Sequence, residues 1–313
     1  MKYIRNGSLD PYYNLAFEEY CFENLYPDED FFIIWRNLPS IIVGSHQNVF
    51  EEVNHHLVKD MNIPVVRRIS GGGTVYHDPG NVNFSFVFNV NEHFNIDYHR
   101  HNQLIIDSLK AMGIDAEMSE RNDLTFKGKK ISGNAQRIIK RRAIHHGTIL
   151  YDADLERLDE VIRPSMTKIE SKAIQSVRSK VINIKPFINR SVDTVETFSE
   201  KMINFLSNNY ECEEFTIHEE DLKAISELEK SKYKSWQWNY GESPKFSYQN
   251  SLMTQYGVLS IDLNVRKGRI ESGYLYGEHL RNEISLKGIE YRLDSIMEVC
   301  QFLNEYEVMK LFF

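Results

Sequence analysis

The sequence has 313 residues, of which 42% are hydrophobic and 26% are charged, a composition typical of a globular protein with a normal core. A net charge of −8 argues against a nucleic-acid-binding protein, and three well-separated cysteines indicate neither a disulfide framework nor a cysteine metal site. No apolar run approaches the about 20 residues of a membrane span, and the first residues lack a signal-peptide pattern. These features together predict a cytoplasmic protein without membrane or nucleic-acid partners.

The first predicted element is a helix. Asp10 followed by Pro11 is typical of a helix start, because aspartate caps the free N–H groups and proline fits the first turn. The helical repeat places Phe17 inward and Glu18 and Glu19 mostly outward. The helix is therefore expected to rest on the core with one face.

Short apolar runs bounded by turn-forming residues predict strands after this helix. Residues 84–90 give the clearest pattern, because phenylalanines alternate with smaller residues and form an aromatic face. A helix over residues 104–112 should end at Gly113, and Lys127-Gly128 predicts a hairpin turn. The predicted strands cover residues 31–35, 41–43, 64–69, 74–76, 84–90, 123–126, 129–132 and 146–151.

The predicted secondary structure changes near residue 245, in the last third of the chain. Ser191 is a candidate cap for a helix, and further helices follow before the tryptophan-, glycine- and proline-containing stretch 236–244. We therefore divide the chain into a large domain, residues 1–245, and a small α+β accessory domain, residues 246–313. The remaining predicted elements are helices at 155–162, 195–206, 219–232 and 296–306 and strands at 258–265 and 269–276.

A glycine-rich segment, residues 67–78, reads Arg-Arg-Ile-Ser-Gly-Gly-Gly-Thr-Val-Tyr-His-Asp. Consecutive glycines let the backbone approach a ligand and point N–H groups at it, and arginines suit carboxylate or phosphate. A P-loop or dinucleotide fingerprint leads from a strand into a helix, whereas this loop is predicted to join two strands. Taken alone, the segment fits a glycine-rich hairpin with solvated arginines about equally well.

A second candidate surrounds Lys130. In a strand over residues 129–132, Lys130 and Ser132 share one face and Lys129 takes the other, so one lysine can enter a pocket while another stays in water. A fixed ammonium would stabilise the charge that develops when a carboxylate attacks the phosphate of ATP. Taken alone, this segment is better interpreted as an exposed basic hairpin.

Amide side chains lie between these two segments, and a pair of histidines follows them. Asn81 and Asn83 share a face if their strand starts early, and buried amides either contact a ligand or cap a turn. The pair His145-His146 raises the question of a metal site. Neither a carboxylate nor a third histidine stands at ligand spacing from that pair, so a zinc site has little support.

These segments, taken together and in this order, closely resemble the lipoate–protein ligase A family. The resemblance implies an α+β fold: a mixed sheet with helices, as in biotin ligases and class II tRNA synthetases, which holds nucleotide on strands, plus a small α+β C-terminal domain. It spans nearly the whole chain. The matching segments are residues 35–37, 44–48, 67–78, 80–81, 122–124, 128–133, 145–148 and the junction 236–246.

The resemblance implies a role for each matching residue. Lys130 would act electrostatically on the lipoyl carboxylate and the α-phosphate, Arg68 would bind phosphate or hold the loop, and Asp123 would help to place Mg²⁺. The implied nucleotide or adenylate contacts are Arg68, Gly72, Gly73, Val75, Tyr76, Asn81, Asp123 and Lys130. The implied lipoate contacts are Trp35, Val43, Gly44, Arg68, Ser70, Gly71, His146 and Gly147.

The implied activity is an ATP-dependent, AMP-forming ligation. Attack of lipoate on the α-phosphate of MgATP gives a mixed anhydride with AMP as leaving group. A lysine of a carrier protein then takes the acyl group. The carrier would be a lipoyl domain of a 2-oxoacid dehydrogenase or the glycine-cleavage H protein. Because the anhydride hydrolyses, a dry slot and a closing loop are expected.

Three alternatives stay open at this point. An octanoyl or lipoyl transferase of the same fold works without ATP through a cysteine nucleophile, but Cys21, Cys212 and Cys300 lie outside the motifs. A biotin ligase matches the arginine–glycine segment less well. A non-catalytic lipoate-binding protein would be expected to lose Lys130 or the glycine loop, and both are intact.

Overall fold

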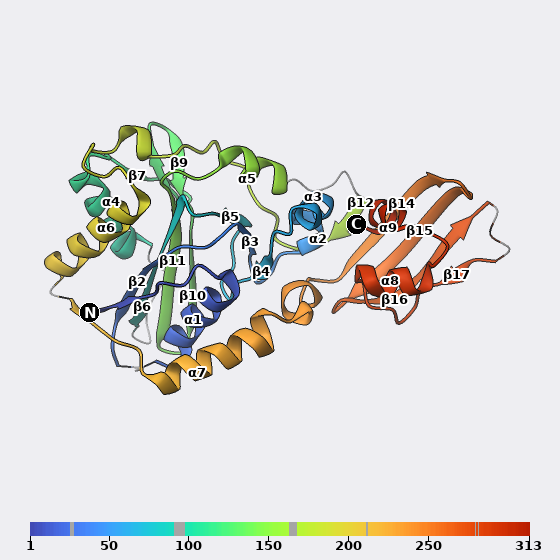
Figure 1. Cartoon of the computed structure of the whole chain (residues 1–313), viewed down its shortest axis with the longest axis horizontal. Helices are drawn as coiled ribbons and strands as arrows, with labels where there is room; N and C mark the ends of the chain where they lie inside the picture. Colours follow the sequence, from blue (N-terminus) through green and yellow to red (C-terminus); the bar gives the residue numbers. More distant parts are fainter. Residues whose placement is uncertain (26–27, 91–97, 163–167, 211, 279, 281) are drawn as a thin grey trace.

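The chain folds into a larger and a smaller part, shown side by side in Figure 1. This computed structural model describes residues 1–25, 28–90, 98–162, 168–210, 212–278, 280 and 282–313. Helices and sheets occur in both parts, and the larger part contains a mixed sheet, which confirms the predicted α+β fold. Among the described helices, none combines the length and the apolarity that crossing a membrane requires.

A six-stranded mixed sheet is the frame of the larger part. The first four strands in the order below pair antiparallel with one another. The last three strands pair parallel with one another. In the register of the sheet, Asn83 lies opposite both Trp35 and Thr148, so side chains from three strands meet on one face. The strand order is β10 (Asn134–Ile139), β11 (Arg142–Leu150), β6 (Asn81–Asn89), β2 (Phe31–Trp35), β1 (Lys2–Arg5) and β13 (Glu213–Glu214).

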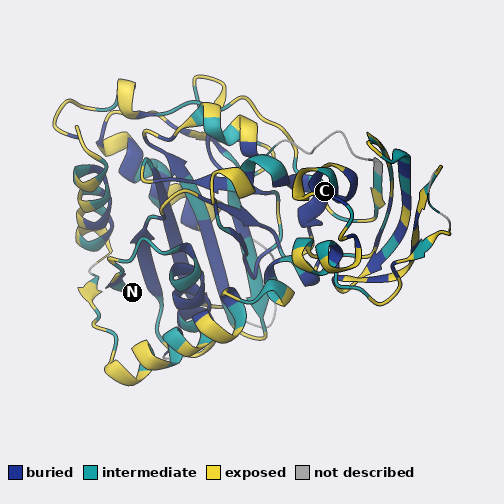
Figure 2. Ribbon diagram, turned by 45° about the vertical axis from the view of Figure 1, so that its right-hand side comes forward, coloured by how far each residue is buried: buried dark blue, intermediate teal, exposed yellow. Residues whose placement is uncertain are grey.

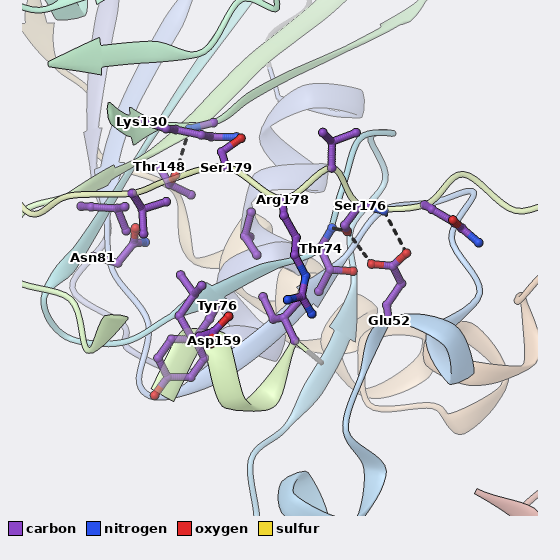
Figure 3. A pocket seen from close by; sticks show the side chains of 18 of the residues that line it. Glu52, Thr74, Tyr76, Asn81, Lys130, Thr148, Asp159, Ser176, Arg178 and Ser179 are labelled. Carbon is purple, nitrogen blue, oxygen red and sulfur yellow. Dashed lines mark hydrogen bonds between the residues drawn. The ribbon is translucent and has the colours of Figure 1, made fainter. Parts of the chain in front are cut away.

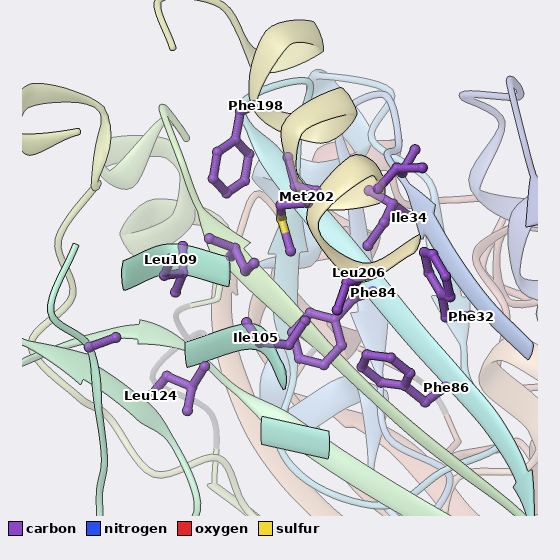
Figure 4. Close-up of a cluster of buried hydrophobic side chains, with 14 of the residues drawn as sticks. Phe32, Ile34, Phe84, Phe86, Ile105, Leu109, Leu124, Phe198, Met202 and Leu206 are labelled. Carbon is purple, nitrogen blue, oxygen red and sulfur yellow. The ribbon is translucent and has the colours of Figure 1, made fainter. Parts of the chain in front are cut away.

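Helices cover both faces of this sheet, so its strands are buried (Figure 2). On one face, the phenylalanines of β2 and β6 pack against α4 (His99–Ala111) and α6 (Val195–Asn209), as Figure 4 shows. This arrangement confirms the aromatic face predicted for β6. On the other face, Trp35 and Val87 pack with α1 (Pro11–Glu23), and α7 (Glu219–Leu228) covers α1.

Two small sheets carry the motifs. The strand order of the first sheet is β4 (Val65–Arg67), β3 (Ser40–Val43) and β5 (Val75–His77). The glycine loop therefore connects the two outer strands of this sheet. The other sheet contains β7 (Glu117–Met118), β8 (Leu124–Phe126) and β9 (Lys129–Ser132). The predicted hairpin turn between β8 and β9 is confirmed, with left-handed φ values of 50° at Lys127 and 69° at Gly128. Short helices α2 (Val49–Glu52), α3 (His55–Asp60) and α5 (Leu155–Val161) surround them.

The smaller part is a five-stranded sheet with two short helices on one face. One of its strands, β12, comes from well before the expected boundary at residue 245, and Phe50 of α2 packs in its core. The division at 245 therefore stays a prediction. The elements are β12 (Lys168–Ser171), β14 (Phe246–Thr254), β15 (Gly257–Arg266), β16 (Arg269–Gly277), β17 (Ile284–Ser285), α8 (Leu293–Val299) and α9 (Glu305–Phe312).

Three local predictions were wrong. Glu18 and Glu19 of α1 are buried, at 1% and 6% exposure, because each meets polar partners from distant segments. The cap of α6 is Thr194 and not Ser191, since the Thr194 hydroxyl accepts the Thr197 N–H. The single final helix is two helices, because Asn304 forms a capping box that starts α9 anew.

Candidate active site

Two cavities adjoin each other between the central sheet and the glycine loop. The larger has a volume of about 620 Å³ and the smaller about 380 Å³. Lys130 is one of the residues that lie in the wall of both cavities. The other residues that line both are Thr74, Val75, Gly133, Thr148, Gln175, Ser176, Val177 and Ser179.

Arg68 holds the glycine loop in shape. Its buried guanidinium donates to the carbonyl oxygens of Gly71 at 2.6 Å and Gly73 at 2.8 Å, and to that of Ile42 at 3.1 Å. Burial lowers the pKa of Arg68 to about 10, so the group remains charged at neutral pH. Of the two roles expected for Arg68, the geometry favours holding the loop over binding phosphate, because carbonyl groups already occupy its donors.

Lys130 projects from β9 toward the cavities, while Lys129 on the opposite face is exposed. Its Nζ lies 2.9 Å from Oδ1 of Asp123, and the two side chains keep 27% and 20% of their surface. A Cβ added at Gly133 would lie 3.0 Å from this Nζ, so the glycine leaves room for the lysine. The strand pattern predicted that the two lysines face opposite ways, and the structure places Lys130, the residue implied by the resemblance, on the cavity side.

A segment without secondary structure, residues 172–181, passes over both cavities; we call it the crossing segment. It pairs with β9, where the Lys130 N–H donates to the Lys180 carbonyl at 2.8 Å. Its Ser176 accepts the Thr74 N–H at 2.8 Å and donates to Glu52, and Arg178 points into the larger cavity (Figure 3). Sequence reasoning missed this segment, whose only signal was a short basic run between polar residues.

Several buried polar atoms of the cavity walls have no hydrogen-bond partner among the described residues. These atoms are Asn81 Oδ1 and Ser132 Oγ, of residues that line the larger cavity, and His77 Nε2 and Asn134 Oδ1, of residues that line the smaller. A buried polar group without a partner destabilises the fold, so these atoms are a cost that the fold bears beside the cavities. Of these residues, only Asn81 was among the expected contacts.

The smaller cavity is partly apolar, with Leu15, Trp35 and Ile42 in its wall. Val43, which was expected there, packs instead with Val49 in the cluster beneath α2, because alternate residues of a strand face opposite ways. Gly44 supports the glycine loop from behind: a Cβ added to it would lie 2.2 Å from the Gly72 carbonyl oxygen.

A hydrogen-bonded chain runs beside the smaller cavity. His146 lies with Nε2 2.6 Å from Ser70 Oγ and Nδ1 2.8 Å from Glu18 Oε1, and Ser85 donates to the same carboxylate at 2.5 Å. The order Ser–His–Glu resembles a nucleophile triad. Ser70, however, lines neither cavity and also accepts a bond from Arg68 Nε at 3.1 Å. The arrangement therefore positions the loop and does not present a nucleophile.

A bound metal cluster has no support within the described ranges. No group of three or more histidine, cysteine or acidic side chains there could hold an ion. His145 is committed to Asn102 and Gln136, and burial keeps its pKa well below the usual value. Asp123 is the carboxylate next to Lys130, and one carboxylate is enough for an ion that arrives with phosphates as its other ligands.

The remaining expected contacts lie around the junction of the cavities. Gly72 and Gly73 border the smaller cavity, and Val75 borders both. Tyr76 borders the larger cavity, and Gly147 the smaller. Gly71 is not part of either wall. The roles of all these residues in binding stay predictions.

Two adjoining cavities that share Lys130 suit an enzyme that brings two ligands together. The family model "Lipoyl protein ligase A/B catalytic domain" matches residues 10–207. Lipoate–protein ligase 1 of Staphylococcus aureus is 37% identical, over 100% of this chain and 96% of its own length. Lipoate–protein ligase LplJ of Bacillus subtilis is also 37% identical, over 97% of this chain and 95% of its own length. The chain therefore belongs to the lipoate–protein ligase family.

Solved structures agree with this assignment. LipL1 of Plasmodium falciparum in complex with lipoate is 27% identical, with a TM-score of 0.64 and 98% of each chain covered. A lipoate–protein ligase A bound with ATP is 26% identical, with a TM-score of 0.65 over 77% of this chain and 98% of its own. The predicted family is confirmed.

Proposed function

We propose that this enzyme activates lipoate with ATP and transfers the lipoyl group to a lysine of a carrier protein. The observation that carries the proposal is the position of Lys130 between the two cavities. Its ammonium stands where a carboxylate from one side and an α-phosphate from the other would meet. The relatives that were solved with lipoate and with ATP support this choice of ligands.

The larger cavity would take MgATP. The amide of Asn81, the ring of Tyr76 and the guanidinium of Arg178 line it and offer polar contacts to a nucleotide. Asp123 would bind the Mg²⁺ that ATP brings, and Lys130 would neutralise the phosphate charge.

The smaller cavity would take the acyl chain. Trp35, Leu15 and Ile42 offer an apolar wall to the tail, and the carboxylate would lie at Lys130. After attack on the α-phosphate, pyrophosphate leaves and the lipoyl–AMP anhydride spans both cavities. The crossing segment lies over the position of this anhydride and would exclude water that hydrolyses it.

The acceptor would be a lipoyl domain of a 2-oxoacid dehydrogenase or the glycine-cleavage H protein. A bipartite lipoate protein ligase of Thermoplasma acidophilum, 26% identical to this chain with a TM-score of 0.65, was described together with its E2 lipoyl domain. That pairing supports a lipoyl domain as the first acceptor to test.

The decisive experiment incubates the enzyme with ATP, Mg²⁺ and lipoate in the absence of any acyl donor protein. We expect AMP-forming turnover with release of pyrophosphate, and mass spectrometry should find the lipoyl group on the lysine of an added carrier. Acyl transfer that proceeds only from a donor protein and without ATP would contradict the proposal and favour the transferase.

The contact between Gly44 and the glycine loop gives a matched pair of variants. Gly44→Ala places a methyl group 2.2 Å from the Gly72 carbonyl oxygen, whereas the methyl group of Gly71→Ala meets only His46, at 3.9 Å. Overpacking of this kind costs about 1–3 kcal/mol. We expect pyrophosphate release to fall about five- to hundredfold in kcat/KM for Gly44→Ala and to stay near wild type for Gly71→Ala. Equal kcat/KM values for the two variants would show that the close approach of Gly44 to the glycine loop does not affect catalysis.

Ser176, which attaches the crossing segment to Glu52 and Thr74, gives a second matched pair of variants. Ser176→Ala removes the hydroxyl that joins Glu52, Thr74 and Gln47. Ser171→Ala removes a similar hydroxyl bond to Glu51 but leaves residues 174–181 in place. We expect Ser176→Ala to raise the KM for ATP about tenfold and to increase release of free lipoate from the adenylate, because one or two buried bonds are lost. An unchanged KM in Ser176→Ala would refute this role.

A further inference from the structure

We propose that the outer face of the crossing segment is the docking surface for the carrier protein, and that it binds an acidic surface beside the acceptor lysine. This inference rests on the proposed function and names the chemistry by which the enzyme recognises that partner. It starts from an uneven distribution of charge. The protein has a net charge of −8, yet residues 171–192 contain five basic residues and neither aspartate nor glutamate.

Two of these basic residues, Lys172 and Lys180, are exposed and stand near the two ends of the crossing segment. Neither forms an ion pair with another described residue, and neither belongs to the wall of a cavity. Val181 pairs with Lys130 of β9 and lines the larger cavity, so the alternation of the chain turns the preceding Lys180 outward. Two ammonium groups without a counter-charge therefore face the solvent on this segment.

Two exposed aliphatic side chains lie between these lysines. Ile174 is 50% exposed and Val177 is 66% exposed. Ile174 also lines the smaller cavity and Val177 lines both, so these side chains stand where the cavity walls reach the surface of the protein. A single exposed aliphatic residue is common on any protein. Two of them at the edge of a site, flanked by charged residues, have the arrangement of a small contact surface with an apolar centre and a polar rim.

The second step of the proposed reaction brings the carrier to this place. The Nζ atom of the acceptor lysine attacks the acyl carbonyl of lipoyl–AMP, an amide bond forms, AMP leaves and the amine loses a proton. That carbonyl would lie close to Lys130, beneath the crossing segment. The surface that carries the acceptor lysine must therefore come to rest on this segment or directly beside it.

The length of the segment suits a single small domain. The eight residues from Lys172 to Lys180 span at most about 29 Å. A typical interface covers about 800 Å² on each partner, which is a patch about 30 Å across. One carrier domain can therefore contact both lysines while its own acceptor lysine enters between them.

The charges indicate which partner surface fits. Unpaired positive charges at the rim of an interface accelerate association with an acidic partner and disfavour a basic one. ATP is an anion too, but Lys172 and Lys180 lie outside the cavity walls that would hold it. We therefore assign these two lysines to the carrier and not to the nucleotide.

Reversal of both charges, in the variant Lys172→Glu/Lys180→Glu, tests the assignment with two measurements. The first is kcat/KM for transfer to an unlipoylated lipoyl domain, which we expect to fall about tenfold at low ionic strength. The second is AMP formation with hydroxylamine in place of the carrier, which reports adenylate formation without a protein acceptor and should stay at the wild-type rate. In about 0.5 M salt the loss of transfer should shrink below about twofold, because exposed charges are screened.

The control variant Lys223→Glu/Lys287→Glu makes the same change in net charge at other places. Lys223 on α7 and Lys287 after β17 are also exposed and lie outside both cavity walls. Transfer by this variant should stay close to the wild-type value. In a further exchange, an acidic residue beside the acceptor lysine of the carrier is replaced by lysine. This carrier should be a poor acceptor for the wild-type enzyme and a better one for Lys172→Glu/Lys180→Glu.

The outcomes separate the two hypotheses. If the wild-type enzyme forms AMP neither with hydroxylamine nor with the carrier, the proposed function fails. If AMP forms but both double variants transfer equally well, or transfer by the wild-type enzyme does not depend on salt, the docking surface is overturned. A higher KM for ATP with an unchanged KM for the carrier overturns it as well, because the lysines then attract the nucleotide. If Lys172→Glu/Lys180→Glu does not fold, the single variants Lys172→Gln and Lys180→Gln replace it, each with an expected loss of about two- to threefold.

Discussion

Lys130→Ala should lower the rate of lipoyl–AMP formation by about 10²–10³, which corresponds to about 3–4 kcal/mol of barrier. The ammonium is held beside Asp123 at the meeting point of the two cavities, so its charge is in place before the phosphate charge develops. Loss of a preorganised donor at such a position lowers kcat more than it weakens binding. Pyrophosphate release at saturating ATP and lipoate measures this rate directly.

The neighbouring lysine supplies the control. Lys129 occupies the same strand but is exposed on its other face, so Lys129→Ala should keep the wild-type rate. Both variants should remain folded, because the Lys130–Asp123 pair is partly solvated and such pairs contribute at most about 1 kcal/mol. Thermal unfolding and circular dichroism check this point. Wild-type turnover in a folded Lys130→Ala variant would remove the basis of the proposed mechanism.

The sequence was sufficient where the cause of a structure is local. The alternation of phenylalanines in β6 predicted a strand, and the pair Lys127-Gly128 predicted the hairpin turn between β8 and β9. Hydrophobic periodicity and turn-forming residues depend on neighbours in the chain, so they can be recognised from one sequence. The glycine loop was recognised for the same reason.

The sequence was insufficient where a partner lies far away along the chain. Glu18 looked like a surface residue of an amphipathic helix, but it meets His146, which is 128 positions away. The crossing segment has no periodic pattern, and its place over the cavities depends on Glu52 and on pairing with β9. Val43 was expected in the cavity wall from the family resemblance, whereas in the structure it packs with Val49 in a separate cluster.

Arg67→Met should destabilise the fold by about 3–5 kcal/mol, the largest loss of stability that we expect from a single exchange. The guanidinium is fully buried and donates to the carbonyls of Gly44 and Gln47, at 2.9 and 2.8 Å. It also donates to the carbonyls of Trp238 and Asn239, both at 3.1 Å. Without it, all these buried acceptors lose their donors, and each unsatisfied group costs about 1–3 kcal/mol in a non-additive way.

The contacts of Arg67 also tie two distant parts of the chain together. One set holds the turn beside the glycine loop, and the other holds the π-helix Gln237–Gly241 at the start of the smaller part. Burial lowers the pKa of Arg67 to about 10, so the group stays charged at neutral pH and keeps all its donors. We therefore expect Arg67→Met to loosen the junction as well, with faster proteolytic cleavage near residues 236–243.

Urea unfolding of Arg67→Met, Arg67→Lys and Arg266→Met tests this prediction. Arg266 is 59% exposed and meets only a surface carboxylate at 3.5 Å, so its exchange should change stability by less than about 0.5 kcal/mol. Lysine restores the charge but not the planar set of donors, and its variant should fall between the other two. If Arg67→Met unfolds at the same urea concentration as Arg266→Met, the buried guanidinium does not hold the junction to the glycine loop.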